Sequence, residues 1–196
     1  MYKIDFSKPI HIHFIGIGGI SMSGLAEILH EEGFTISGSD SKESDLTKTL
    51  AAKGIKVIYG QSADNITSDI DLVVYTAAIH ESNPEFAAAK AAGIPMLTRA
   101  ELLGQIMDNY DYSIAVAGTH GKTTTTSMIS EILLAAQTDP TISVGGILSS
   151  IHGNLRVGDS EYFISEACEY TNSFLNFRPR YSIILNIEAE IGRAHV

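Results

Sequence analysis

Positive charge, cysteine and long apolar runs are all scarce in this chain of 196 residues. Thirteen Lys and Arg residues stand against 23 Asp and Glu residues, and the net charge of −10 argues against a protein that binds the phosphate backbone of a nucleic acid. Cys168 is the only cysteine, which excludes a disulfide within the chain and is typical of a reducing compartment. No uncharged apolar stretch approaches the ~18 residues of a membrane-spanning helix. We therefore expect a cytoplasmic protein without nucleic-acid or membrane partners.

Apolar residues are plentiful by contrast. They make up 44% of the chain against 18% charged residues, a balance that predicts a packed core rather than disorder. The N-terminal apolar run from Ile10 to Ile20 carries histidines and glycines, and no small-residue cleavage site follows it. We interpret this run as a strand and a turn, not as a signal peptide.

Short β-branched runs alternate with segments of helical periodicity along the chain. The expected strands are residues 10–15, 34–40, 55–58, 71–75, 94–97, 113–117, 141–144, 162–165 and 181–185. Helices are expected between most of them, and the last helix carries an apolar stripe formed by Ile129, Ile132, Leu133 and Ala136. This order predicts an α/β fold with parallel sheets and helices on both faces. The polar break at Asp108–Asp111 predicts a domain boundary.

The strongest functional signal is a glycine-rich loop between an expected strand and an expected helix. Its residues are Gly118, Thr119, His120, Gly121, Lys122, Thr123 and Thr124. Glycines let several backbone N–H groups point at one phosphate, and the helix that follows presents its positive dipole end. Lys122 can reach the β- and γ-phosphates, and the Thr123 hydroxyl can bind Mg²⁺. The loop therefore predicts ATP or GTP binding. The alternative is a glycine-rich helix start with a solvated lysine, because Val116 stands where the general P-loop pattern has its first glycine.

A second glycine loop lies near the N-terminus. Gly16, Gly18 and Gly19 follow the first expected strand in a pattern close to the dinucleotide fingerprint G-x-G-x-x-G, with Ser21 in place of the third glycine. Asp40 ends the next strand, where an acid meets a ribose hydroxyl. This loop alone leaves NAD, another phosphorylated ligand and a tight turn without ligand as alternatives. Both loops together suggest phosphoryl transfer onto a nucleotide-linked substrate.

In combination these motifs resemble the Mur ligase family of cell-wall synthesis over residues 10–189. The similar stretches are His11–Glu27, Ser37–Asp40, Arg99–Leu103, Gly118–Thr124, Glu166–Tyr170 and Leu185–Ala189. The family's G-T-x-G-K-[ST] loop also accounts for the departure from the general P-loop pattern. The resemblance implies a Rossmann-like domain that binds UDP-N-acetylmuramate at residues 1–108. It further implies a truncated P-loop-type α/β central ATPase domain at residues 109–190.

The resemblance also implies a reaction, the ATP- and Mg²⁺-dependent ligation of L-alanine to UDP-N-acetylmuramate in peptidoglycan precursor synthesis. The lactyl carboxylate of the sugar nucleotide becomes an acyl phosphate, which the amine of L-alanine attacks with release of phosphate. Catalytic roles transfer to Lys122, which would neutralise the migrating phosphoryl group, and to Glu166. Thr123 and Glu166 would hold Mg²⁺, since two oxygen ligands with phosphates and waters suit this ion.

The family also implies a set of substrate-binding residues. These are Gly16, Gly18, Gly19, Asp40, Thr76, Ala77 and Ala78. The three glycines would lie against the UDP diphosphate, with Asp40 near the uridine. The segment that begins at Thr76 would border the same substrate from the C-terminal end of a strand, where open α/β sheets bind ligands.

Some candidate residues have simpler interpretations. Glu166 ends an expected buried strand and could form a salt bridge instead of binding a metal. His11 and His13 lie on one strand face and are interpreted as structural histidines. Cys168 has acidic neighbours that disfavour a thiolate, so we expect it to be inert. His152–Asn154 is expected in a loop and resembles family positions near the active site.

The last residues depart from the family. After Ala189 the family continues with an Asp-His pair, whereas Glu190 follows here. Residues 191–196 read Ile-Gly-Arg-Ala-His-Val, which a common sequencing adapter encodes in this frame, so we expect a non-native tail. The family's amino-acid site lies in a C-terminal domain, and we expect no ligase turnover from these residues alone.

Three alternatives to the L-alanine reaction stay open. The first is another ligase of the superfamily, such as one that recycles murein tripeptide. The second is an NAD-dependent oxidoreductase that uses the loop at Gly16 and leaves the loop at Gly118 unexplained. The third is a non-catalytic module that binds a UDP-sugar.

Overall fold

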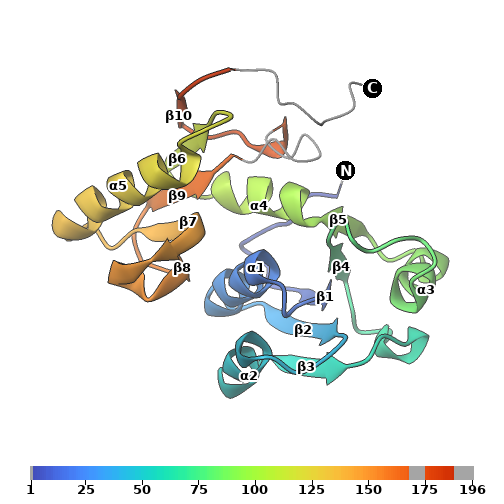
Figure 1. The fold of residues 1–196 in the computed structure, drawn as a ribbon. Helices are drawn as coiled ribbons and strands as arrows, with labels where there is room; N and C mark the ends of the chain where they lie inside the picture. The colour runs from blue at the N-terminus through green and yellow to red at the C-terminus, as the bar shows by residue number, and fades with distance from the viewer. Residues whose placement is uncertain (1, 168–174, 188–196) are drawn as a thin grey trace. The chain divides into compact units, whose positions relative to one another are not determined.

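The computed structural model describes residues 2–167 and 175–187 (Figure 1). The chain forms two compact units, one up to Leu103 and one from Gly104 onward, and each has its own sheet. The α/β class expected from the sequence is confirmed. The division falls inside α4 (Arg99–Met107), and the domain boundary expected at residue 108 stays a prediction. Cys168 and the expected tail at residues 191–196 lie outside the described residues.

The first unit is built on a parallel sheet with the strand order β3-β2-β1-β4-β5. The strands are β1 (His11–Ile15), β2 (Thr35–Asp40), β3 (Lys56–Tyr59), β4 (Leu72–Tyr75) and β5 (Met96–Thr98). The helices are α1 (Ile20–Glu31), α2 (Asp45–Ala52), the short η1 (Ala63–Asn65), α3 (Pro84–Ala92) and α4. The strand order reverses at β1, which pairs with β2 on one side and β4 on the other. In doubly wound sheets, ligands bind at the carboxyl ends of the strands beside such a reversal.

The start and the end of α3 show how local sequence sets these elements. The side chain of Asn83 accepts hydrogen bonds from the N–H groups of Glu85 and Phe86, and Pro84 occupies the first helical position. Gly93 then ends the helix in the left-handed conformation, with φ of 69°. Proline at the start and glycine after the end are the expected asymmetry, so the predicted helix is confirmed.

The second unit has a mixed sheet with the order β10-β6-β9-β7-β8. Its elements are β6 (Tyr112–Ala117), α5 (Lys122–Ala135), β7 (Thr141–Leu148), η2 (Ser149–Ile151), β8 (Gly153–Arg156), β9 (Tyr162–Glu166) and β10 (Tyr181–Ile184). β7 and β8 pair antiparallel, while the other pairs are parallel. The strand expected at 141–144 therefore continues to Leu148. The loop expected at His152–Asn154 is wrong in part, because Gly153 and Asn154 begin β8 and only His152 makes the turn, with φ of 53°.

The core-facing side of α5 also differs from the expectation. Ile129 and Leu133 pack against a core formed by β7 and β9, as predicted. Ile132, however, is 65% exposed, while Thr126 and Ser130 are fully buried. Small polar side chains thus occupy the centre of the buried face, where the Ser130 hydroxyl donates to the carbonyl of Thr126 one turn earlier. The expected apolar stripe is therefore confirmed at Ile129 and Leu133 and wrong at Ile132 and Ala136, which are exposed.

Candidate functional site

The N-terminal glycine loop connects β1 to α1 and is held by the end of β2. The N–H groups of Gly16 and Ile17 donate to the carbonyl of Ser39 at 2.8 and 2.9 Å. The N–H of Gly18 donates to Oδ2 of Asp40 at 2.9 Å. The loop conformation is therefore set by hydrogen bonds to two consecutive residues of the neighbouring strand.

Gly18 is required by close approach. An added Cβ would lie 2.7 Å from Oδ2 of Asp40 and 2.7 Å from Cγ2 of Thr47, closer than real Cβ contacts. Gly16 is required for a different reason, because its φ of 85° is a left-handed conformation that side chains disfavour. Glycine is therefore needed at these two positions for different physical reasons.

The backbone N–H groups that are open to an anion come just after the glycines in the sequence. The N–H of Gly19 donates to the carbonyl of Gly16 at 3.2 Å, so each of the loop N–H groups from Gly16 to Gly19 already has a protein acceptor. In the part of the chain that the structure describes, the N–H groups of Ile20, Ser21 and Met22 have no hydrogen-bond acceptor, and α1 has no side-chain cap. Unpaired donors at a helix N-terminus attract negative charge. The start of α1, rather than the glycines, therefore carries the N–H groups that remain open to an acceptor.

The segment that begins at Thr76 lies beside this loop. Ile15 at the end of β1 pairs with Tyr75 at the end of β4, so the two segments that follow leave the sheet next to each other. The N–H of Ala78 donates to the Thr76 hydroxyl at 3.3 Å. Burial raises the pKa of the Tyr75 phenol, and the charge of Glu101 raises it further, so this side chain stays neutral. The structure thus brings the predicted substrate-binding residues of both segments, with Asp40, to one edge of one sheet.

The two histidines of β1 have protein partners. Nε2 of His11 lies 2.8 Å from the Ser37 hydroxyl, and its Nδ1 lies 2.9 Å from the Asp69 carboxylate. Nδ1 of the fully buried His13 lies 2.9 Å from the same Ser37 hydroxyl. These contacts agree with the structural interpretation of both residues.

The second glycine loop connects β6 to α5. Gly118 has φ of 144° and Gly121 has φ of 84°, and both conformations favour glycine. Space is also short, since a Cβ added at Gly118 would lie 3.1 Å from Cβ of Leu185. The segment after β10 therefore packs closely on this loop.

Asn186 fixes the loop from that segment. Its Oδ1 accepts from the N–H of His120 and its Nδ2 donates to the carbonyl of the same residue, both at 3.0 Å. This paired contact holds the loop backbone at His120. The sequence places Asn186 in a family-like motif but carries no signal for this contact.

Lys122 lies over its own loop. Its Nζ donates to the carbonyl of Gly118 at 2.5 Å and to that of Thr119 at 3.4 Å. In the first turn of α5, the N–H groups of Thr123 and Thr124 have no acceptor among the described residues. A lysine ammonium and unpaired N–H groups thus meet at the N-terminus of a helix, an arrangement suited to phosphate.

The two predicted metal ligands lie together at this loop. The Thr123 hydroxyl donates to Oε2 of Glu166 at 3.2 Å, and the N–H of Gly145 donates to Oε1 at 2.6 Å. Adjacent ligands of an octahedral Mg²⁺ lie about 3 Å apart, from bond lengths of about 2.1 Å, so this oxygen pair fits the ion. Within residues 2–167 and 175–187 no group of three or more His, Cys, Asp or Glu side chains could hold a metal.

Gly145 was not predicted as part of this site. A Cβ at that position would lie 2.8 Å from Oε2 of Glu166, so glycine is needed for the carboxylate to approach β7. The Gly145-Gly146 pair in the sequence is the signal that could have indicated it.

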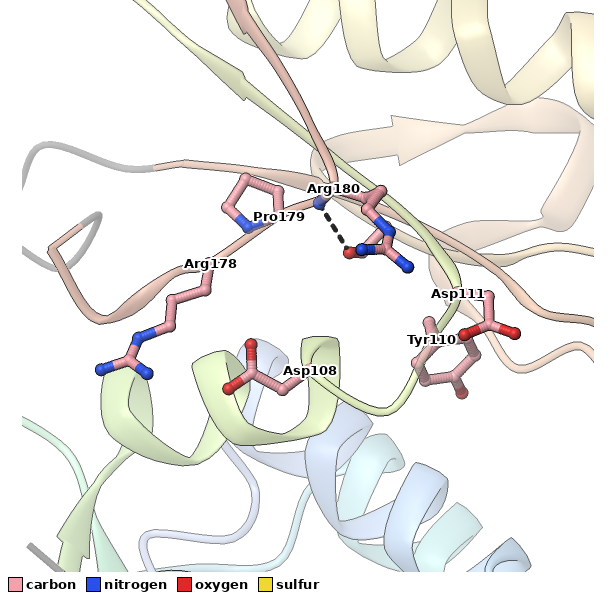
Figure 2. A pocket seen from close by; sticks show the side chains of 7 residues that line it. Asp108, Tyr110, Asp111, Arg178, Pro179 and Arg180 are labelled. Atoms are coloured by element: carbon pink, nitrogen blue, oxygen red, sulfur yellow. Dashed lines mark hydrogen bonds between the residues drawn. The ribbon is translucent and has the colours of Figure 1, made fainter.

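A pocket of about 260 Å³ in the second unit lies elsewhere (Figure 2). Its lining residues are Asp108, Tyr110, Asp111, Ser113, Arg178, Pro179 and Arg180. They lie at the amino ends of the parallel strands β6 and β10, whereas the glycine loop follows the carboxyl end of β6. The N–H of Arg180 donates to the Ser113 hydroxyl at 3.1 Å and closes one side of the pocket (Figure 2). None of the predicted site residues lines it.

Among the residues that the structure describes, no helix combines the length and the apolar character needed to cross a membrane.

Comparisons with known proteins match both units. The Mur ligase family, catalytic domain, matches residues 11–111, and the Mur ligase middle domain matches residues 116–195. The chain is 99% identical over 190 residues to the UDP-N-acetylmuramate–L-alanine ligase of Agathobacter rectalis, covering 97% of this chain and 41% of that protein.

Two solved structures are also similar. The UDP-N-acetylmuramate–alanine ligase of Thermotoga maritima is 36% identical with a TM-score of 0.79, over 89% of this chain and 41% of that one. The UDP-N-acetylmuramate:L-alanyl-γ-D-glutamyl-meso-diaminopimelate ligase of Neisseria meningitides is 31% identical with a TM-score of 0.83, over 93% of this chain and 62% of that one. The chain spans less than half the length of the L-alanine ligases it matches.

Proposed function

The chain belongs to the Mur ligase family, and we propose that it forms the UDP-N-acetylmuramate-binding and ATP-binding parts of a UDP-N-acetylmuramate–L-alanine ligase. One observation carries the proposal. Two glycine loops follow the carboxyl ends of parallel strands in two different sheets, and each leads to a helix start with unpaired N–H groups. The 99% identity to an L-alanine ligase supports the choice of substrates.

We assign the first loop to the sugar nucleotide. The unpaired N–H groups at the start of α1 bind the diphosphate, and Gly16, Gly18 and Gly19 form the tight turn that presents them. Asp40 uses Oδ2 to hold the loop, which leaves Oδ1 facing Ser41 at 3.3 Å and available to a ribose hydroxyl. Thr76, Ala77 and Ala78 border the same ligand.

We assign the second loop to Mg²⁺-ATP. Gly118, Thr119, His120 and Gly121 shape the loop around the phosphates, and the N–H groups of Thr123 and Thr124 donate to them. Lys122 turns from the loop carbonyls to the phosphates when these bind, which replaces hydrogen bonds to neutral carbonyls with contacts to a charged acceptor. Thr123 and Glu166 would hold Mg²⁺, which would supply positive charge to the phosphate oxygens.

The proposed reaction of the whole ligase needs both ligands. An oxygen of the lactyl carboxylate attacks the γ-phosphorus and ADP leaves, giving an acyl phosphate. The amine of L-alanine then attacks the acyl carbon, phosphate leaves, and the amine loses a proton to form the amide. Lys122 stabilises the transferring phosphoryl charge.

The alternatives differ in how well they agree with the comparisons. An NAD-dependent oxidoreductase does not explain the match to two Mur ligase domains. A ligase that uses a tripeptide is represented by the Neisseria structure, but that protein is 31% identical, against 99% for the L-alanine enzyme.

Isothermal titration calorimetry on the 196-residue chain tests the proposal. We expect one site for UDP-N-acetylmuramate and one for Mg²⁺-ATP, with Lys122→Met weakening only the second. NADH, the control ligand, is expected to release no binding heat. Binding of NADH in competition with UDP-N-acetylmuramate would contradict the proposal.

A further inference from the structure

Glu85 is a fully buried carboxylate that the proposed function does not use. It lies in the first turn of α3 with an exposed fraction of 0%. Acidic residues at this position of a helix are normally solvated, and a buried carboxylate is costly unless hydrogen bonds satisfy it. Its burial therefore needs a structural or functional reason.

The carboxylate joins separate elements of the first unit. Oε2 accepts from the hydroxyl of Ser39 in β2 at 2.5 Å, and Oε1 accepts from Nδ2 of Asn65 in η1 at 2.6 Å. Nε2 of His13 in β1 lies 3.7 Å from Oε1, with both side chains fully buried. The two short hydrogen bonds, to Ser39 and Asn65, hold the Glu85 carboxylate in one arrangement, whereas Nε2 of His13 has no hydrogen-bond partner among the described residues.

Ser39 links this network to the glycine loop. Its side chain donates to Glu85, while its carbonyl accepts from the N–H groups of Gly16 and Ile17. Ser39 is fully buried, so water cannot replace either contact. Asp40, the next residue, accepts from Gly18. Three consecutive N–H groups of the loop thus depend on the position of the end of β2, where the Ser39 hydroxyl contacts the Glu85 carboxylate.

We propose that Glu85 is a positioning residue for the sugar-nucleotide site: it holds the end of β2 through the Ser39 hydroxyl and so sets the loop that leads to the start of α1. The inference rests on the proposed function for the identity of the ligand. The predicted effect on the loop geometry does not depend on the proposed function, because the geometry can be measured without ligand.

The test compares Glu85→Gln with a matched control. Glutamine cannot accept at both positions: with its oxygen toward the Asn65 amide, its NH₂ group faces the Ser39 hydroxyl, which must then accept and loses the acceptor for its own proton. Glu32→Gln makes the same change at an exposed position at the far end of α1. We expect Glu85→Gln to raise the Kd for UDP-N-acetylmuramate about tenfold, a size typical for removing a supporting hydrogen bond behind a binding group. Glu32→Gln should leave the Kd unchanged within about twofold.

Amide hydrogen exchange separates positioning from general stability. We expect exchange of the Gly16 and Ile17 amides to accelerate about tenfold in Glu85→Gln, while the Val73 amide, which donates to the carbonyl of Pro95 in the same sheet, is unchanged. Faster exchange at Val73 as well would show a merely structural role and would overturn the proposal. Unchanged loop exchange and affinity in a folded variant would overturn it too.

Ser39→Ala provides the second variant. It removes the hydroxyl that Glu85 contacts but keeps the carbonyl that the loop uses, and it should reproduce both effects. The double variant should show less than the sum of the single effects, because the two residues act through one contact. If Glu85→Gln does not fold, the affinity and the loop exchange rates of Ser39→Ala test the positioning role instead. If the unaltered chain does not bind UDP-N-acetylmuramate, the proposed function fails, and the loop exchange rates alone decide the positioning role.

Discussion

At the scale of single residues, the two loops depend on a few close contacts that tolerate little change. Gly18 and Gly145 each allow a carboxylate to approach the backbone, from Asp40 and Glu166 respectively. In both places the glycine and the acid lie far apart in sequence, and the fold pairs them. Substitutions at these positions should therefore affect ligand binding and stability together.

Gly18→Ala tests the first contact. The added Cβ would lie 2.7 Å from atoms of Asp40 and Thr47, and overpacking of this kind typically costs about 1–3 kcal/mol. We expect a lower free energy of unfolding in urea and a weaker affinity for UDP-N-acetylmuramate. Gly153→Ala is the control, because its Cβ would meet no atom closer than 3.9 Å. Equal stabilities for the two variants would contradict the packing argument.

Glu166→Gln tests the proposed Mg²⁺ ligands. A neutral amide is a weaker ligand than a carboxylate, so the increase in ATP affinity that Mg²⁺ produces should fall by about tenfold or more. Thr123→Val, which removes the hydroxyl, should lower the same increase. Glu161→Gln changes an exposed residue just before β9 and is the control. Calorimetric titration of ATP with and without Mg²⁺ measures the effect, and an unchanged increase in Glu166→Gln would argue for a salt-bridge or capping role.

The positions of both glycine loops could be predicted because each glycine-rich segment stands between an expected strand and an expected helix, while their contacts to phosphate stay a prediction. The sequence did not predict Glu85, Ser39 or Asn186 as supports of these loops. An acid in the first turn of a helix and a serine in a strand are common, and only the fold shows that they meet in the core.

At the scale of elements, the strands and helices of the first unit follow from apolar runs punctuated by glycine, and the predicted boundaries agree with the structure within a few residues. β8 was not predicted, because Gly-Asn-Leu-Arg shows no alternation of apolar and polar residues. It forms by antiparallel pairing with β7 across the short η2 turn, with a register shift between Ser143 and Leu148 that a simple alternation does not encode.

The cap of α3 can be tested directly. Asn83→Ala removes the acceptor for the N–H groups of Glu85 and Phe86, and loss of an N-cap typically costs about 1 kcal/mol. Asn83→Asp keeps an acceptor at the same position and should retain most of the stability. Thermal unfolding of the three proteins measures the difference, and equal losses in both variants would show that the capping hydrogen bonds are not the cause.

An ion pair at the start of β7 predicts a pH dependence. The hydrogen bond from Arg156, with the N–H of Asp159 as a second donor, lowers the pKa of Asp139 below its usual value of 3.8. A lowered pKa in the folded state means that the contribution is present above about pH 4 and is lost as the pH falls through the folded pKa. Asp139→Asn should therefore lower Tm at pH 7, and this difference should shrink toward zero below about pH 3. Asparagine suits the backbone here, where φ is 53°. A Tm difference that stays constant down to pH 2.5 would contradict this origin.

At the scale of the whole molecule, each proposed ligand belongs to one unit. The first unit has its own sheet and core, in which Ile15, Val73 and Ala89 are buried together. We expect residues 1–108 to fold alone and to bind UDP-N-acetylmuramate with a Kd within about threefold of the whole chain, since every described contact of the first loop lies within this segment. Circular dichroism and calorimetry on this segment check the expectation, and a folded segment without affinity would place part of the site elsewhere.

Assignment of the two ligands to two loops is best measured by amide chemical shifts on the isotopically labelled chain. UDP-N-acetylmuramate should shift the resonances of Gly16–Met22, Asp40 and Thr76–Ala78, and Mg²⁺-ATP should shift those of Gly118–Thr124 and Glu166. Each ligand should leave the other set unchanged when it is added alone. The proposal would be contradicted if UDP-N-acetylmuramate shifted only the second set, or if neither ligand shifted the loop that precedes its proposed helix.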